Sequence, residues 1–183
     1  MKSKLINLFG GPGIGKSGIC SGITYHLKKN HISCNNVYEF PKIIAWDNNL
    51  HAIKDQLYIL ANQHRGVSQC YGKVDYVLVD SPVLFSLIYN KFYDSGYPSE
   101  LYNEDFNRLV LNIHQYYNNT NILLKRNPTS IHNQNERFQT PEQSLLIDQL
   151  CKEVLDEYSI PYIEVEVNDK SVKKILEELG LPE

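Results

Sequence analysis

The chain has 183 residues, a formal net charge of −3 and a pI near 6.1. This length suits one domain with a substantial core, so residues 1–183 are expected to form a single domain. The acidic balance provides no global basic field, which argues against nucleic acid as a partner, and no apolar stretch reaches membrane-spanning length. The four cysteines are widely spaced without a C-x-x-C pair, which indicates reduced thiols in a cytoplasmic protein.

Strand and helix patterns alternate along the chain, as expected of an α/β fold whose parallel sheet is covered on both faces, a three-layer sandwich. Strands are expected at residues 5–9, 37–38, 74–79, 122–124 and 162–167. Helices are expected at about 15–29, 43–65 (as one or two), 82–89 with Pro82 in the first turn, 100–117, 144–158 and 169–179, where Gly180 predicts the end. The polar residues 126–140 after the fourth strand are interpreted as a mobile lid segment.

A phosphate-binding motif lies between the first strand and the first helix. Residues 10–17 read Gly-Gly-Pro-Gly-Ile-Gly-Lys-Ser, which is G-x-x-x-x-G-K-S in its required strand–loop–helix context. Lys16 is expected to reach the β- and γ-phosphates of ATP, and the Ser17 hydroxyl to bind Mg²⁺. Whether ATP or GTP is preferred stays open. The expected nucleotide-binding residues are Gly11, Pro12, Gly13, Ile14, Gly15, Lys16, Ser17 and Gly18.

Two carboxylates follow predicted strands and therefore lie at the edge of the sheet where ligands bind. Asp80 comes directly after the apolar run 76–79 and is expected to hold Mg²⁺ or accept a proton; its alternative role is to cap the next helix. Glu39 follows the second strand and is expected to take a proton from a substrate hydroxyl, or to be a first-turn acid of a helix. Which of the two is the catalytic carboxylate stays open.

The remaining predicted site residues are cationic, amide or aromatic. Arg126 and Arg137 flank the lid segment and would stabilise the transferring phosphoryl group. The helical stretch after the second strand carries amides that suit a base edge, and two aromatic residues could stack on a ring or belong to the core. These substrate-side residues are Tyr38, Glu39, Trp46, Gln56, Gln63 and Arg65. The histidines at 26, 51, 114 and 132 have no metal-ligand spacing and are expected at the surface.

Together, the phosphate loop, Tyr38-Glu39, Asp80-Ser81-Pro82 and the Arg126–Arg137 segment resemble the P-loop kinases of nucleosides and nucleotides. More closely, the chain is similar to ATPase/kinase-like proteins of large tailed bacteriophages, which are related to the ribosylnicotinamide kinase domain of bacterial NAD regulators. The likeness covers nearly the whole chain, including residues 56–58, 63–65, 86–89 and 137–140. It implies a five-stranded parallel sheet in the order 2-3-1-4-5, bound ATP-Mg²⁺ and a mobile lid, in a host cytoplasm if the chain is phage-encoded.

The sequence therefore predicts an ATP-dependent kinase for a small-molecule acceptor, a nucleoside or a nucleoside monophosphate. Nicotinamide riboside is a rival acceptor. The Asp-Arg-Ser signature of deoxyribonucleoside kinases is missing, since Ser81-Pro82 follows Asp80 instead, so the identity of the acceptor stays open. The alternatives from other classes are a regulatory P-loop NTPase that acts on a protein or nucleic-acid partner, and a polynucleotide-end kinase, against which the acidic charge speaks. The sequence leaves a monomer and a homodimer equally open.

Overall fold

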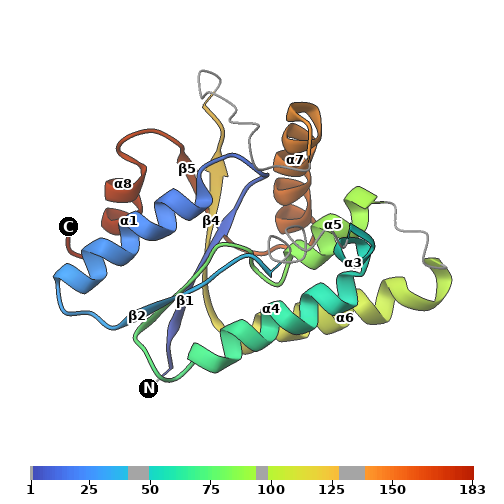
Figure 1. Cartoon of the computed structure of the whole chain (residues 1–183), viewed down its shortest axis with the longest axis horizontal. Coiled ribbons are helices and arrows are strands. Elements are labelled where there is room, and N and C mark those ends of the chain that lie inside the picture. Colours follow the sequence, from blue (N-terminus) through green and yellow to red (C-terminus); the bar gives the residue numbers. More distant parts are fainter. Residues whose placement is uncertain (1, 41–49, 94–98, 128–138) are drawn as a thin grey trace.

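The computed structural model describes residues 2–40, 50–93, 99–127 and 139–183 (Figure 1). Its centre is a sheet of five strands that all pair in parallel in the order β2-β3-β1-β4-β5, which confirms the expected topology. The strands are β1 (Lys4–Phe9), β2 (Cys34–Val37), β3 (Tyr76–Val79), β4 (Asn118–Lys125) and β5 (Ile163–Glu166). The helices are α1 (Lys16–Lys29), α3 (Leu50–Lys54), α4 (Gln56–Cys70), α5 (Phe85–Tyr93), α6 (Ser99–Tyr116), α7 (Pro141–Glu157) and α8 (Ser171–Glu178).

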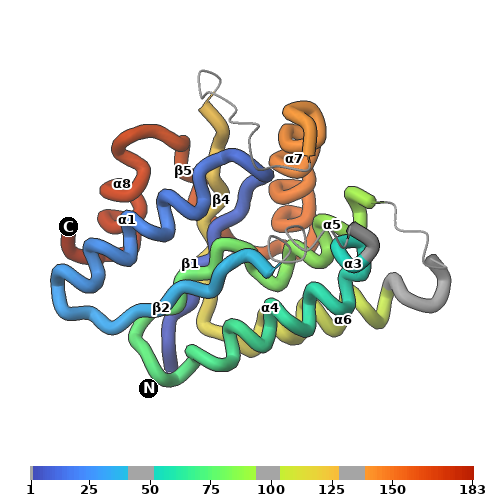
Figure 2. The backbone as a smooth tube through the Cα atoms, viewed as in Figure 1, coloured from blue at the N-terminus to red at the C-terminus, as the bar shows by residue number. Residues whose placement is uncertain are grey.

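Helices cover both faces of the sheet, so the three-layer arrangement is confirmed. Helices α1 and α8 lie on one face, and α4, α5, α6 and α7 lie on the other, as the backbone trace in Figure 2 shows. Along β1, Ile6 and Leu8 pack toward α1 and α8, whereas Leu5 and Phe9 pack toward the opposite layer. Within the described ranges, no helix has both the length and the apolar character needed to cross a membrane.

The second strand is longer than predicted and ends one residue earlier. It runs over Cys34–Val37, so Tyr38 lies beyond its end. The hydrophobic pattern did not indicate the first part of this strand, because it contains the polar residues Asn35 and Asn36. Polar residues are tolerated there because β2 is an edge strand and only Val37 of its four residues is buried. The open edge of the sheet thus accommodates side chains that a central strand would bury.

The fourth strand begins at Asn118 instead of the predicted Ile122. Its first half is polar, but the side-chain amides there have hydrogen-bond partners inside the protein. The buried Asn7 of β1 donates through Nδ2 to Oδ1 of Asn119 and to Oδ1 of Asn121, both at 2.9 Å. The Asn121 amide in turn donates to the carbonyl of Pro161 at 3.0 Å. Buried amides that have hydrogen-bond partners are compatible with a sheet interior, so the polar residues did not mark where this strand begins.

Capping groups set where the helices near the site begin. Thr140 caps α7 in a reciprocal capping box with Gln143, so the helix starts at Pro141, three residues before the predicted start. Pro82 precedes α5 instead of lying in its first turn: its carbonyl accepts the Phe85 N–H at 2.8 Å, and the helix begins at Phe85. The start of each helix is therefore decided by a local hydrogen bond.

The described part of the predicted helical stretch 43–65 forms two helices, α3 and α4. Helix α3 ends at Lys54, and the side chain of Asp55 accepts the Tyr58 N–H at 3.0 Å, which caps α4. Helix α4 continues to Cys70, beyond the predicted end. Residues 41–49, the beginning of the predicted stretch, lie outside the described residues.

The end of the last helix is as predicted. Gly180 adopts a left-handed φ of 64°, and its N–H bonds to the carbonyl of Glu177 at 3.0 Å. The Leu181 N–H bonds to the carbonyl of Leu176 at 2.8 Å, which completes the two hydrogen bonds of a Schellman motif.

His114 is buried, contrary to the expectation that it lies at the surface. It sits in the last turn of α6 with 7% of its surface exposed, on the inward side of the helix. Burial disfavours the imidazolium and lowers the pKa of His114 from 6.5 to about 4.

This burial predicts a defined loss of stability in acid. Between pH 6.5 and about 4 the unfolded chain binds a proton on His114 that the folded chain does not, so the free energy of unfolding falls as the pH falls. At 1.36 kcal/mol per pKa unit the loss is about 3 kcal/mol. Urea unfolding across this pH range should show the loss in the wild type and not in His114→Asn. His31→Asn, a matched change at an exposed histidine, should keep the wild-type profile; identical profiles for all three proteins would refute the assignment.

Candidate active site

The phosphate loop connects β1 to α1 at the carboxyl edge of the sheet. Gly10, Gly13 and Gly15 have φ values of 146°, 85° and 104°, a backbone conformation that glycine adopts without strain. Gly15 is the N-cap of α1 and no side chain caps this helix, whose first turn contains no acidic residue. The first N–H groups of α1 therefore have the arrangement of an anion-binding helix terminus.

Lys16 is held over the loop by main-chain carbonyls. Its Nζ donates to the carbonyl of Gly10 at 2.7 Å and to that of Gly11 at 3.2 Å, and it lies 5.5 Å from the ring centre of Phe85. The side chain is largely buried, with 8% of the residue exposed. An ammonium group has three N–H donors, so these two hydrogen bonds leave one for a phosphate oxygen.

Ser17 and Asp80 meet at the same edge of the sheet, although 63 residues separate them. The Ser17 hydroxyl donates to Oδ2 of Asp80 at 2.5 Å. Asp80 is 4% exposed, and its Oδ1 is a buried oxygen without a hydrogen-bond partner. A buried carboxylate oxygen without a partner is costly, which indicates that a cation or donor completes the site. A hydroxyl and a carboxylate are oxygen ligands of the kind that Mg²⁺ prefers, so this pair fits the predicted metal site.

Arg126 contacts both the phosphate loop and α7 in the described structure. Its Nε donates to Oδ2 of Asp148 at 2.7 Å, and its Nη2 donates to the carbonyl of Pro12 at 3.0 Å. The side chains of Arg126 and Asp148 are 14% and 19% exposed, so the ion pair is largely desolvated. Arg137, the other predicted lid arginine, lies outside the described residues.

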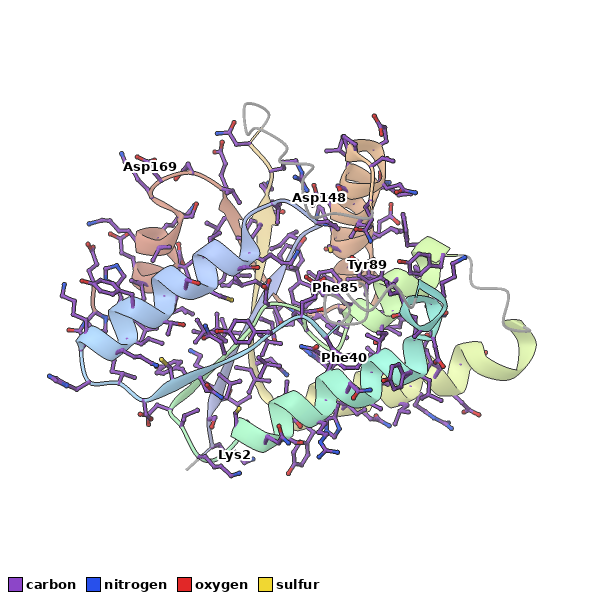
Figure 3. All side chains as sticks on the ribbon, viewed as in Figure 1. Lys2, Phe40, Phe85, Tyr89, Asp148 and Asp169 are labelled. Carbon is purple, nitrogen blue, oxygen red and sulfur yellow. The ribbon has the colours of Figure 1, made fainter. Side chains whose placement is uncertain are left out.

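Asp148 is a site residue that the sequence analysis missed. It lies on α7, where its Oδ1 accepts the Gly11 N–H at 2.5 Å, and Figure 3 shows it beside the loop between β1 and α1. Ser144 and Cys151, four residues before and three after it, are both buried. A charged residue on the buried stripe of an otherwise apolar helix face was the available signal.

The structure brings together only some of the residues that were predicted to bind the acceptor. Glu39 is half-buried just after β2, while Tyr38 beside it is 73% exposed. On α4, Gln56 and Gln63 are buried, and Oε1 of Gln56 and Nε2 of Gln63 are without hydrogen-bond partners. Arg65 is exposed and does not join them, because two residues turn a helix by about 200°. Trp46 lies outside the described residues.

Aromatic side chains of α5 separate this acceptor side from α7. Phe85 stacks on Phe9, with ring centres 5.8 Å apart, and Tyr89 follows one turn later on the same helix (Figure 3). Burial, and to a smaller extent the negative charge of Glu39, raises the pKa of the Tyr89 phenol well above 10. Tyr89 therefore stays neutral at physiological pH.

An open groove of about 270 Å³ lies between β2 and α4. Its lining includes Tyr38, Phe40 and Cys70 together with side-chain amides from both elements, which belong to Asn35, Asn36, Asn62, Gln63 and Gln69. The Phe40 N–H donates to Oε1 of Gln63 at 3.4 Å, which leaves the Nε2 group of this buried glutamine for another acceptor. The groove offers neutral hydrogen-bonding groups, and none of its lining residues within the described ranges is a cation.

The cysteines are free thiols, as predicted. Burial raises the pKa of Cys20 far above its usual range and that of Cys151 to about 12, so neither is a reactive thiolate at neutral pH. Within the described part of the chain, no group of three or more His, Cys, Asp or Glu side chains could hold a metal ion. The Ser17–Asp80 pair therefore needs further ligands, such as phosphate oxygens or water, to bind Mg²⁺.

Comparison with known proteins agrees with the fold. A family model described as "AAA domain" (AAA_28) matches residues 5–173. No curated protein sequence matches the chain.

Solved structures of kinases share the architecture at low sequence identity. Deoxyadenosine kinase from M. mycoides with bound dATP is 19% identical with a TM-score of 0.65, over 96% of this chain and 99% of that one. The same enzyme with bound dCTP is 17% identical with a TM-score of 0.64, over 96% and 98%. NadR protein in complex with NR is 13% identical with a TM-score of 0.66; the match covers 98% of this chain and about half, 51%, of that chain. The chain thus has the fold of the P-loop kinases.

The buried Asp80 oxygen predicts how the site responds to Mg²⁺. Asp80→Asn removes the carboxylate charge, so Mg²⁺ should no longer raise the affinity for ATP, a loss of about tenfold or more. The apo protein should melt at the wild-type temperature or above it, because a buried charge with an unpaired oxygen is removed. Calorimetric titration with ATP in Mg²⁺ and in EDTA measures the first effect. Asp156→Asn, at the far end of α7, is the control; an unchanged Mg²⁺ effect in Asp80→Asn would exclude the metal role.

Proposed function

The chain belongs to the AAA_28 family of AAA domains, and we propose that it is an ATP-dependent phosphotransferase that moves the γ-phosphoryl group of ATP onto a nucleoside or nucleoside monophosphate. The observation that carries this proposal is the Ser17–Asp80 hydrogen bond, with its unpaired Asp80 oxygen, beside the lysine of a glycine-rich loop. Phosphate-loop donors, an ammonium and a pair of oxygen ligands are the groups that a Mg-nucleoside triphosphate requires.

The proposed mechanism assigns a task to each group on the nucleotide side. The N–H groups at the start of α1 bind the phosphates, and Lys16 stabilises the charge that develops on the oxygens of the transferred group. Mg²⁺, when bound at Ser17 and Asp80, would neutralise charge on the β- and γ-phosphates. Positioning and electrostatic stabilisation supply most of the catalysis in this type of transfer.

Proton removal from the acceptor is assigned to Glu39. In the transfer, the acceptor hydroxyl oxygen forms a bond to the γ-phosphorus as the bond to the β–γ bridging oxygen breaks, which releases ADP. The hydroxyl proton passes to the Glu39 carboxylate, because one oxygen of Asp80 accepts from Ser17 and the other would hold the metal ion when it is bound. Glu39 follows β2 and Asp80 follows β3, and the Asp80 N–H bonds to the Val37 carbonyl, which supports their closeness at one sheet edge.

The groove between β2 and α4 favours an uncharged acceptor, a nucleoside, over its monophosphate. It lies next to Tyr38 and Phe40 at the end of β2, and the lining residues that the structure describes offer amides and no cation to a ligand. Amide groups match the donor and acceptor edge of a base, whereas a phosphate would require arginine or lysine. We assign the base of the acceptor to this groove, with Gln63 as its main hydrogen-bonding contact.

The function is tested directly by an acceptor panel. ATP consumption with Mg²⁺ should be stimulated strongly by one member of a panel of nucleosides, nucleoside monophosphates and nicotinamide riboside, and by none in Lys16→Ala. Identification of the phosphorylated product by mass spectrometry names the acceptor. Steady hydrolysis that is indifferent to every acceptor would overturn the kinase proposal in favour of an ATPase that acts on a protein or nucleic-acid partner.

The assignment of Gln63 predicts a selective loss. Gln63→Leu keeps the volume of the buried side chain and removes its Nε2 donor, so the KM for the acceptor should rise about tenfold to a hundredfold, the effect of one lost hydrogen bond in a buried site. The KM for ATP should change less than about twofold. Gln149→Leu, the same change at an exposed position of α7, is the control. An unchanged KM for the acceptor in Gln63→Leu would show that the base does not bind in this groove.

A further inference from the structure

One peptide unit of the phosphate loop is held from both sides. The carbonyl of Gly10 accepts from Nζ of Lys16 at 2.7 Å, and the N–H of Gly11 donates to Oδ1 of Asp148 at 2.5 Å. These two groups belong to the same planar peptide bond, in which the carbonyl and the N–H point in opposite directions. Fixing the direction of the N–H therefore fixes the direction of the carbonyl and of the ammonium that donates to it.

The contact with α7 leaves this peptide little freedom. A Cβ placed on Gly11 would lie 2.3 Å from the carbonyl oxygen of Ser144 and 2.9 Å from Oδ1 of Asp148. The loop thus packs directly on the backbone of α7, and only a glycine fits at this position. Because helix backbone does not yield to such a contact, Asp148 is held at a constant place relative to the loop.

Asp148 also fixes the next part of the loop through Arg126. Its carboxylate accepts from Nε of Arg126 at 2.7 Å and from Nη2 at 3.3 Å, and the same Nη2 donates to the carbonyl of Pro12 at 3.0 Å. The ion pair is largely desolvated, which strengthens its hydrogen bonds and fixes the guanidinium plane. A single carboxylate on α7 therefore orients the loop at Gly11 directly and at Pro12 through the arginine.

We propose that Asp148 is a positioning residue for Lys16: by accepting the Gly11 N–H it orients the Gly10 carbonyl, which in turn aims the lysine ammonium at the phosphates. This inference rests on the proposed nucleotide site and assigns no contact between Asp148 and the nucleotide. In this arrangement Arg126 stabilises the loop through the Pro12 carbonyl and does not need to reach the transferred phosphoryl group. The sequence motif ends at Ser17, so this support comes from a residue more than 130 positions away.

A double-mutant cycle on ATP binding tests the proposal. Calorimetry with Mg²⁺ and ATP would compare the wild type, Asp148→Ala, Lys16→Ala and the double variant. Asp148→Ala should weaken ATP binding by about tenfold in the wild-type background and by less than about twofold in the Lys16→Ala background, because the lysine that it aims is then absent. The same loss in both backgrounds would show that Asp148 acts on the loop independently of Lys16, and no loss in either would exclude a role; both results overturn the proposal.

The conservative variant separates positioning from general support of the fold. Asp148→Asn keeps an oxygen that accepts the Gly11 N–H and loses the charge that pairs with Arg126. It should restore most of the ATP affinity lost in Asp148→Ala and keep slow exchange of the Gly11 amide proton, which should be fast in Asp148→Ala. An affinity as low as that of Asp148→Ala together with a protected Gly11 amide would overturn the proposal.

The cycle stays informative if Asp148→Ala does not fold. The same cycle is then run with Asp148→Ser, whose shorter side chain no longer reaches the Gly11 N–H, and the same loss of ATP affinity in both Lys16 backgrounds would refute the inference. Failure of the kinase proposal is distinct, because it appears as ATP binding without an acceptor that is phosphorylated. A wild-type chain that binds no ATP would overturn both proposals at once. Asp156→Ala controls for a surface change on α7 and should bind ATP as the wild type does.

Discussion

The site depends on the hydrogen bond between Ser17 and Asp80, which joins the start of α1 to the end of β3. It can form because β1 and β3 are adjacent and parallel, with Asn7 opposite Val79, so both chains leave the sheet at the same edge. The geometry places the hydroxyl of the exposed Ser17 beside the buried carboxylate of Asp80, of which one oxygen is unpaired. An unpaired buried carboxylate oxygen lowers the stability of the fold. The arrangement therefore indicates a ligand-binding role and not a structural one.

The rest of the molecule can be understood as support for this edge. Parallel pairing brings the ends of β2, β3, β1 and β4 together, which places Glu39, Asp80, the phosphate loop and Arg126 along one border of the sheet. The opposite layer then contributes what the strands do not: α7 brings Asp148 against the loop, and α4 brings the buried Gln63 to the side of β2. This division agrees with the general rule that open parallel sheets bind ligands at their carboxyl edge.

Buried polar groups have two different meanings in this chain. The asparagines of β1 and β4 bond to one another and to main-chain carbonyls, so they specify the pairing of two central strands. Gln56, Gln63 and Asp80 are equally buried, but each keeps an atom without a partner; Asp80 follows β3, and the two glutamines lie on α4. Among the buried side-chain amides, this contrast separates those that join β1 to β4 from those of α4 that keep an unpaired atom, which composition could not do.

The sequence by itself determined the class of fold, the order of the elements and the phosphate loop, because periodicity and glycine motifs act over a few neighbouring residues. It also placed Asp80 and Glu39 at strand ends, since an apolar run followed by a carboxylate is a local pattern. Only the tertiary structure decided the length of β2 and β4, the burial of His114, and the separation of Arg65 from the glutamines of its own helix.

Tertiary structure alone also brought Asp148 to the Gly11 N–H and Arg126 to the Pro12 carbonyl. The physical reason is that these contacts join residues far apart in the chain, and their geometry follows from the packing of a whole helix against a sheet, which no local pattern encodes.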